Sequence, residues 1–253
     1  MKYFKTVILG AGLSGLSAGF FAESGSMANN DFIILEKENH PGGLCKSFNI
    51  NNFIFDYTGH LFHYSDSFSK KFFQKILQKN INCLQRKAFI KIFNNFIPYP
   101  FQLNLSYLPS ENNFKCLYSF IRSFYSNSVS NKNYLEWMNT YFGGEICKHF
   151  MIPYNKKLWK TDLSKITTDW FSNYMPMPKM EEVLKGAISK KNSFKGYNHK
   201  FYYPQKNGIG SLINYLFEKN KNKILLNYKI KHIDIQKKII ISTDQKNKYE
   251  NLI

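Results

Sequence analysis

Apolar runs and helical spacings alternate along the first forty residues. Lys5 to Leu9 (KTVIL) is a short β-branched run typical of a strand buried in a parallel sheet, and the residues from Leu16 to Glu23 have helical spacing. A second apolar run, Asp31 to Leu35 (DFIIL), follows. This order predicts a strand–helix–strand unit with a parallel sheet at the start of an α/β protein.

The rest of the chain is mostly helical in its centre and strand-rich at its end. Helical spacing predicts helices at Ser67–Asn80, Phe114–Tyr125, Tyr134–Phe142 and Gly210–Glu218. Strands are expected at Ala88–Phe93, around Pro98, at Lys223–Tyr228, Ile230–Ile235 and Lys238–Ser242, with another beginning at Tyr249. We therefore expect a first domain of residues 1–70 and 195–253, interrupted by a helical and sheet insertion of residues 71–194.

The first strand ends in a glycine-rich turn. Gly10, Gly12 and Gly15 form a Gly-x-Gly-x-x-Gly sequence (GAGLSG, including Ser14) that leads into the helix. In a dinucleotide-binding turn these glycines permit the tight turn, the approach of a pyrophosphate and close helix–strand packing. Glu36 ends the next strand, where a carboxylate accepts ribose hydroxyls. The alternative is an ordinary βαβ turn with Glu36 facing solvent.

The residues after Glu36 favour FAD over NAD. Lys37 follows, and a short loop leads to Gly42, Gly43 and Leu44. This stretch resembles the extended fingerprint of FAD enzymes of the glutathione-reductase type, whose Gly-Gly backbone lies against the flavin side of the cofactor. The expected fold class is therefore α/β: a Rossmann-like FAD/NAD(P)-binding domain of that type with an inserted helical plus sheet substrate domain.

The segment Phe55–His63 (FDYTGHLFH) has three interpretations. His60 and His63 with Asp56 could converge on a metal, although no further ligand stands nearby at a usual spacing, so we expect no metal site. A packed aromatic hairpin is the second. Third, FDYTGHLFHY resembles the segment that UDP-galactopyranose mutases and related oxidoreductases place beside the isoalloxazine ring. That resemblance implies flavin contacts by Gly59 and His60, with His60 orienting and polarising the flavin edge as the catalytic residue.

Further motifs of the same family follow in order along essentially the whole chain. PYPFQLN at 98–104 resembles the stretch that faces uridine diphosphate, which implies roles for Tyr99 and Gln102. HFMIPYNKKLW at 149–159 resembles the signature whose Asn and final Trp line the nucleotide pocket, here Asn155 and Trp159. Residues 198–212 resemble a third element that begins with Asn198, and Ile230 matches a position whose backbone meets adenine. Plain core packing is the alternative for any single aromatic, because aromatics make up 17% of the chain.

The resemblance implies an FAD flavoenzyme that interconverts UDP-galactopyranose and UDP-galactofuranose through flavin N5, without net redox change, in the synthesis of cell-surface polysaccharide. An FAD oxidoreductase of the protoporphyrinogen-oxidase and amine-oxidase group is the first alternative. The second is an inactive remnant, because relatives continue beyond the position of Ile253 through a C-terminal flavin-contacting portion. We expect the FAD domain of this chain to be incomplete and the 253 residues alone to be inactive.

The composition of the chain limits the classes of molecule that it is expected to bind. The net charge is +18, but only Arg86 and Arg122 are arginines and the lysines are spread along the chain, so we expect no nucleic acid partner. The partner should be a nucleotide-sugar or another small molecule, and homo-oligomer formation stays open. Four widely spaced cysteines without Cys-x-x-Cys pairs indicate free thiols in a reducing cytoplasm. Four glycines interrupt the apolar run Val7–Ala22, which argues against a signal peptide. No run reaches the roughly 18–20 apolar residues of a transmembrane helix.

Overall fold

The structure is a computed structural model that describes residues 2–25, 32–64, 66–126, 132–170, 177–190, 199–243 and 245–253. The chain forms two compact units. Unit 1 comprises Met1–Leu84 and Tyr202–Ile253, and unit 2 comprises Gln85–Phe201. The chain passes between the units within β5 (Asn82–Gln85) and β8 (Lys200–Tyr203), which pair with each other in a two-stranded sheet.

Unit 1 is built on a six-stranded sheet with the order β10-β11-β12-β1-β2-β9. Strands β12, β1, β2 and β9 are parallel, and β10, β11 and β12 are joined antiparallel. The bounds are β1 Tyr3–Leu9, β2 Phe32–Leu35, β9 Ile224–Leu225, β10 Ile230–Asp234, β11 Ile239–Ser242 and β12 Lys246–Leu252. The strands expected after residue 222 therefore return to the sheet of β1, and the last of them begins at Lys246, three residues before Tyr249. This mixed α/β architecture is the predicted fold class.

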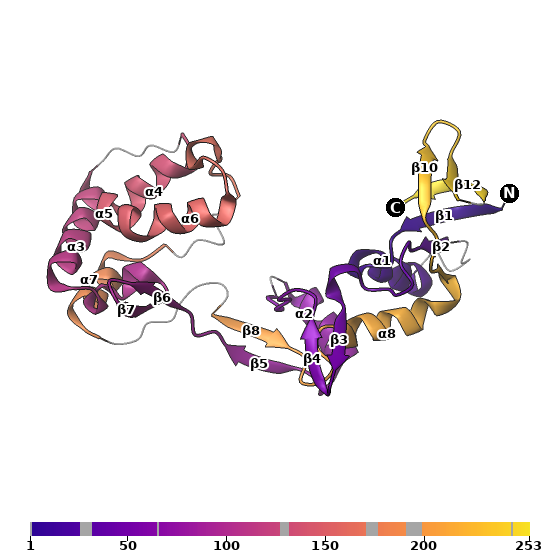
Figure 1. The fold of residues 1–253 in the computed structure, drawn as a ribbon, viewed down its shortest axis with the longest axis horizontal. Coiled ribbons are helices and arrows are strands. Elements are labelled where there is room, and N and C mark those ends of the chain that lie inside the picture. Colours follow the sequence, from indigo (N-terminus) through magenta and orange to yellow (C-terminus); the bar gives the residue numbers. More distant parts are fainter. Residues whose placement is uncertain are drawn as a thin grey trace. The chain divides into compact units, whose positions relative to one another are not determined.

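The described part of unit 1 contains the helices α1 (Leu13–Ser24), α2 (Ser67–Leu77) and α8 (Gly210–Asn220). Figure 1 shows α1 and α8 close to the sheet. They approach closely at Gly19, where an added Cβ would overlap the Asn220 side chain. Asn220 is 1% exposed and its amide donates to the carbonyls of Leu16 (3.0 Å) and Leu216 (2.8 Å), which joins the two helices.

Helix α2 explains why unit 1 extends past residue 70. Its residues Ile76 and Leu77 are buried in the same apolar cluster as Leu16 and Leu212. Asp66 caps its first turn, since the carboxylate accepts from the Ser69 N–H at 2.7 Å. The helix therefore packs with the glycine-rich unit, although we expected the insertion to begin at residue 71.

Unit 2 has a helical core beside the hairpin of β6 (Phe89–Ile92) and β7 (Asn95–Pro98). Its large buried side chains include Phe101, Phe120, Tyr134 and Phe142. A π-helical turn at Cys147–Met151 links two of its helices. The helices are α3 Ser110–Tyr125, α4 Tyr134–Phe142, α5 Gly144–Ile146, α6 Ile152–Trp159 and α7 Met180–Ile188. The predicted helix at 134–142 and strands near 89–98 are confirmed.

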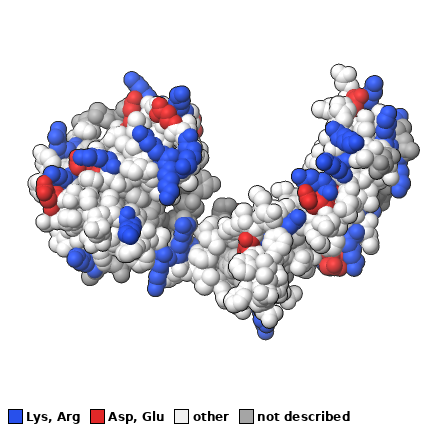
Figure 2. All heavy atoms as spheres, in the orientation of Figure 1, with Lys and Arg blue, Asp and Glu red and all other residues white. Residues whose placement is uncertain are grey.

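Lysines are scattered over the surface of both units. On the face drawn in Figure 2 the blue side chains are separated by uncharged surface, and red carboxylates are few. Among the described residues, no helix is long and apolar enough to cross a membrane. The four cysteines are unpaired, and Cys45, Cys116 and Cys147 are buried.

Candidate functional site

The glycine-rich turn lies at the carboxyl end of β1 and leads directly into α1. Gly15 packs against the turn so closely that an added Cβ would overlap the carbonyl oxygen of Gly10. At Gly10 and Gly12, in contrast, an added Cβ would meet nothing within 4 Å, so space is open beside the turn. Gly12 is the N-cap of α1 and no side chain caps this helix, and Ser14 lies exposed in its first turn. Uncapped N–H groups at a helix N-terminus favour an anion.

Glu36 faces this turn rather than solvent. It is 7% exposed, and its carboxylate accepts from the N–H of Ala11 at 2.7 Å and from the N–H of Glu38 at 2.9 Å. A carboxylate has about four acceptor positions, so two bonds leave capacity for further donors. The alternative of a solvent-facing Glu36 is wrong for this structure. Lys37 points outward and pairs with Glu38 at 3.7 Å.

The Gly42-Gly43 pair packs against the glycine-rich turn. Gly42 forms a bridge with Gly12, and its N–H donates to the Ala11 carbonyl at 2.7 Å. Gly42 has φ = 115°, a left-handed conformation that requires glycine, and Ile213 lies 3.1 Å from the position of its missing Cβ. Leu44 follows and is 63% exposed. Residues 10–15, 36 and 42–43 are therefore brought together.

The hairpin of β3 (Ser47–Ile50) and β4 (Phe53–Asp56) precedes the segment of Gly59 and His60. The backbones of Tyr57 and Phe62 anchor this segment, because Tyr57 N–H donates to the Lys46 carbonyl and Phe62 exchanges two hydrogen bonds with Tyr202. Between them, the His60 ring lies 2.9 Å from the Thr58 hydroxyl through Nδ1. An added Cβ at Gly59 would meet nothing within 4 Å, so the space beside the Gly59 backbone is open.

Asp56 ties the hairpin to the start of α8. Its carboxylate accepts from the Ser47 hydroxyl at 2.5 Å, from the Ile209 N–H at 3.2 Å and from the Tyr203 hydroxyl, while Ser47 Oγ accepts from the Gly210 N–H at 2.7 Å. Burial, and then the bond to Asp56, raise the pKa of Tyr203, so its hydroxyl stays a donor. Sequence reasoning considered Asp56 only as a metal ligand. In the part of the chain that the structure describes, no three His, Cys, Asp or Glu side chains gather in a metal-binding arrangement.

The residues expected to contact a nucleotide lie in unit 2. Their side chains differ in solvent exposure and in hydrogen bonding within the unit. Gln102 is 1% exposed, Tyr99 is half-buried, and Trp159 is 41% exposed with its ring 5.0 Å from that of Trp170. Asn155 is 4% exposed, and its polar groups are engaged within the unit. Its Oδ1 accepts from the Tyr134 hydroxyl at 3.1 Å, and its amide donates to the Met151 carbonyl at 2.8 Å.

Asn198 and Ile230 are the other two predicted binding residues. Asn198 lies outside the described residues. Ile230 begins β10 on one edge of the six-stranded sheet and is half-buried in a small cluster with Val7 and Ile240.

Sequence reasoning missed Asn104, which is 1% exposed and donates to the carbonyls of Pro98 (3.0 Å) and Pro100 (2.9 Å). Its signal was present, because an Asn four residues after Pro100 of a Pro-x-Pro sequence is well placed to donate to the carbonyls of that turn.

Residues 8–76 match the family model described as an NAD(P)-binding Rossmann-like domain. A solved structure of a reduced UDP-galactopyranose mutase matches 98% of this chain with 28% sequence identity and a TM-score of 0.87. This chain resembles a UDP-galactopyranose mutase along nearly its whole length. A putative protoporphyrinogen oxidase from Exiguobacterium sp. 255-15 matches 99% of the chain with 17% identity and a TM-score of 0.69, which shows a shared fold.

The chain spans 54% of the length of the mutase and 58% of the length of the oxidase. The recognition of a mutase-like chain from its motifs is confirmed, as is the Rossmann-like fold. A dinucleotide cofactor is implied by the domain and by these neighbours, and the open space at Gly10 and Gly12 beside an uncapped helix fits one.

Proposed function

We propose that unit 1 binds FAD and that the chain serves a mutase that interconverts UDP-galactopyranose and UDP-galactofuranose. The observation that carries this proposal is the mutase match over 98% of the chain at 28% identity. The order of the motifs from the Gly-Gly pair to HFMIPYNKKLW supports it, since fold similarity alone does not specify activity.

The cofactor would lie along the glycine-rich turn. Its pyrophosphate would occupy the open space beside Gly10 and Gly12, where the α1 N-terminus favours negative charge. The ribose hydroxyls of the adenosine would donate to Glu36, whose carboxylate is held in place by the Ala11 and Glu38 N–H groups. The flavin side would meet the backbone of Gly43 and Gly59. Ile230 is proposed to meet the adenine through its backbone.

When bound and reduced, the flavin supplies the nucleophile that such a mutase requires. The chain itself would hold and orient. His60, whose ring is fixed by Thr58, would hold a hydrogen bond to the flavin edge. Tyr99, Gln102 and Trp159 are proposed to hold the nucleotide, and Asn198 is a further candidate. Asn155 is proposed to shape that pocket from behind, because its amide is already engaged by Tyr134 and Met151.

Purification tests the cofactor first. We expect a yellow protein with flavin absorbance, or a colourless one that takes up added FAD with saturable affinity. The Gly12→Val variant, which fills the proposed pyrophosphate space, should not take up FAD. A folded chain that neither retains nor binds FAD would overturn the proposal and favour the inactive remnant.

The dithionite-reduced protein with UDP-galactopyranose tests the reaction. Formation of UDP-galactofuranose, lost in His60→Ala, supports the mutase. Substrate-dependent flavin bleaching with peroxide production and no isomerisation would instead favour an oxidoreductase of the protoporphyrinogen-oxidase and amine-oxidase group. If FAD binds but neither reaction occurs, the same assay should be repeated with a polypeptide that carries the part of the mutase length not spanned here. Absence of isomerisation in that assay contradicts the proposed activity while leaving the FAD site intact.

A further inference from the structure

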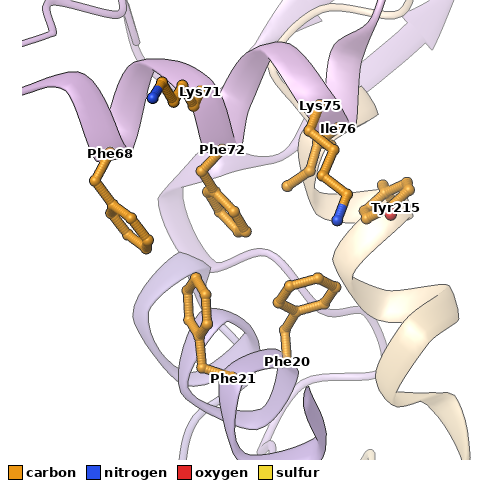
Figure 3. Close-up of a pocket in the computed structure, with 8 residues that line it drawn as sticks. All are labelled: Phe20, Phe21, Phe68, Lys71, Phe72, Lys75, Ile76 and Tyr215. Atoms are coloured by element: carbon orange, nitrogen blue, oxygen red, sulfur yellow. The ribbon is translucent and has the colours of Figure 1, made fainter. Parts of the chain in front are cut away.

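One face of unit 1 carries an aromatic patch with a cavity of about 290 Å³ between α1, α2 and α8. We define this patch by its four phenylalanines, Phe20, Phe21, Phe68 and Phe72. Figure 3 shows Phe68 and Phe72 pointing from α2 toward Phe20 and Phe21 on α1, with a gap between the two helices. None of these residues belongs to the proposed FAD or nucleotide site.

The four rings form one contiguous surface. The ring centroids of Phe21 and Phe72 lie 5.0 Å apart, those of Phe20 and Phe72 lie 5.5 Å apart, and those of Phe21 and Phe68 lie 5.8 Å apart. Phe68 is 63% exposed and Phe21 is 41% exposed. Helix α2 buries other residues, Ile76 and Leu77, in the core. Phe20 and Phe72 are half-buried against the core, so the exposed part of the patch is Phe68 and Phe21, whose adjacent rings indicate a binding surface.

The charged residues within α2 are all lysines, and Asp66 is the carboxylate at its N-cap. Lys70, Lys71 and Lys75 lie within the helix, Lys79 follows it, and no Asp or Glu occurs between Ser67 and Leu77. Lys71 and Lys75 line the cavity itself, and Figure 3 shows the Lys75 side chain extending toward Tyr215. On α8, Lys219 Nζ lies 5.7 Å from the centroid of the Tyr215 ring. Aromatic rings beside Lys71 and Lys75 favour an occupant that offers both apolar surface and negative charge.

We infer that the aromatic patch binds the surface of a bilayer that contains anionic phospholipid. An amphipathic helix with phenylalanines on one side and lysines on its polar side lies in the plane of such an interface. Phe68 and Phe21 insert at the boundary between headgroups and acyl chains. Lys71 and Lys75 remain at the level of the lipid phosphates, because long lysine side chains keep their ammonium groups at the polar layer.

The experiment is co-sedimentation of the full chain with vesicles of phosphatidylcholine alone or of phosphatidylcholine mixed with phosphatidylglycerol. Binding is expected with the mixed vesicles only. The paired variant Lys71→Gln/Lys75→Gln should lower the partition coefficient by about 30-fold, from roughly 1 kcal/mol per lysine near an acidic surface. Lys231→Gln/Lys248→Gln removes the same charge from exposed positions on β10 and β12 and should have a much smaller effect.

A second pair of variants measures the apolar contribution to vesicle binding separately from the contribution of charge. Phe68→Ser should weaken binding by about tenfold, since an inserted aromatic side chain loses part of its 1.5–3 kcal/mol burial energy. Phe114→Ser is the matched control, because Phe114 is 66% exposed on α3 of unit 2. Thermal unfolding should show all four variants folded. Three results would each overturn the inference: no binding to mixed vesicles, equal effects of the two lysine pairs, or equal effects of the two phenylalanine variants.

Discussion

The backbone N–H of Ala11, inside the glycine-rich turn, donates to the Glu36 carboxylate at the end of the neighbouring strand over 2.7 Å. This bond joins the two sequence features that indicated a dinucleotide site, the turn after β1 and the acid after β2. Glu36 therefore shapes the turn even without a ligand. A Glu36→Gln variant keeps an acceptor for Ala11, so it should fold normally but bind FAD more weakly, by about tenfold for a lost charge-assisted hydrogen bond. Fluorescence titration with FAD checks this, and unchanged affinity would contradict the ribose role.

Gly15 and Gly12 should respond differently to alanine. Gly15→Ala places a Cβ against the Gly10 carbonyl and should lower the free energy of unfolding by about 1–3 kcal/mol. Gly12→Ala meets only open space at φ = −74°, so its stability should stay within about 0.5 kcal/mol while FAD affinity falls. Chemical denaturation and FAD titration of both variants provide the comparison. Equal stability of the two would contradict the close helix–strand packing described at Gly15.

Asp56 should be required for the stability of the hairpin and of the α8 N-terminus. Asp56→Ala leaves the Ile209 N–H and the Tyr203 and Ser47 hydroxyls without their acceptor, which should cost about 1.5–3 kcal/mol. Tyr203→Phe removes one donor only and should cost less. Glu218→Ala, an exposed carboxylate on the same helix, should leave thermal unfolding unchanged. If Asp56→Ala were as stable as Glu218→Ala, the network would have no energetic role.

Asn155 and Trp159 separate a packing role from a binding role in unit 2. Asn155→Ala removes the buried Oδ1 that accepts from the Tyr134 hydroxyl at 3.1 Å and should destabilise the protein by about 1–3 kcal/mol. Trp159→Ala, at a position 41% exposed, should destabilise less and should instead weaken UDP binding. Denaturant unfolding together with isothermal titration of UDP measures both quantities. A stable Asn155→Ala variant with lost UDP affinity would contradict the packing role and support direct contact between Asn155 and the nucleotide.

Thiol reactivity should divide the cysteines by burial. Burial raises the pKa of Cys147 to about 12, and burial followed by the Glu145 charge raises that of Cys116 to about 12, whereas Cys83 is exposed. Because the thiolate is the reactive form, an alkylating reagent at pH 8 should modify Cys83 rapidly and Cys116 and Cys147 only after unfolding. Mass spectrometry of digested protein identifies the modified residues, and rapid modification of Cys147 in the folded chain would contradict its burial.

The same two thiols give a stability prediction with a defined sign. Their pKa in the folded chain lies above the ordinary thiol value of 9.0, which applies to the unfolded chain. Their contribution to stability is therefore complete below pH 9 and is lost as the pH rises toward 12. The free energy of unfolding should fall across this range, and a Cys116→Ala/Cys147→Ala variant should show a smaller decrease over the same range.

The sequence was informative where local backbone geometry decides the structure. The glycine spacing and the two apolar runs predicted β1, α1, β2 and the position of Glu36, because those constraints act within a few residues. The positions of Asp56 and Asn155 depend on partners that packing brings from distant segments, Tyr203 and Tyr134. A motif gives the residue type at such a position but not its partners, so Asp56 was weighed as a metal ligand and Asn155 as a nucleotide contact. Unit 1 runs to Leu84, beyond the expected boundary at residue 70, and α2 joins it through buried contacts of Ile76 and Leu77.

The pairing of β1 with β12 sets an order for folding during synthesis. Lys2 N–H donates to Asn247 across 245 positions of sequence, and β1 and β12 run parallel from Tyr3 and Lys248 to Val7 and Leu252. Unit 2 is one continuous segment, so all its contacts are available once residue 201 has left the ribosome. The central strand β1, in contrast, has an open edge until β12 arrives, and an unpaired edge invites pairing with other chains. Strand β1 is thus completed only after β12 has been synthesised, and its edge stays open to other chains until then.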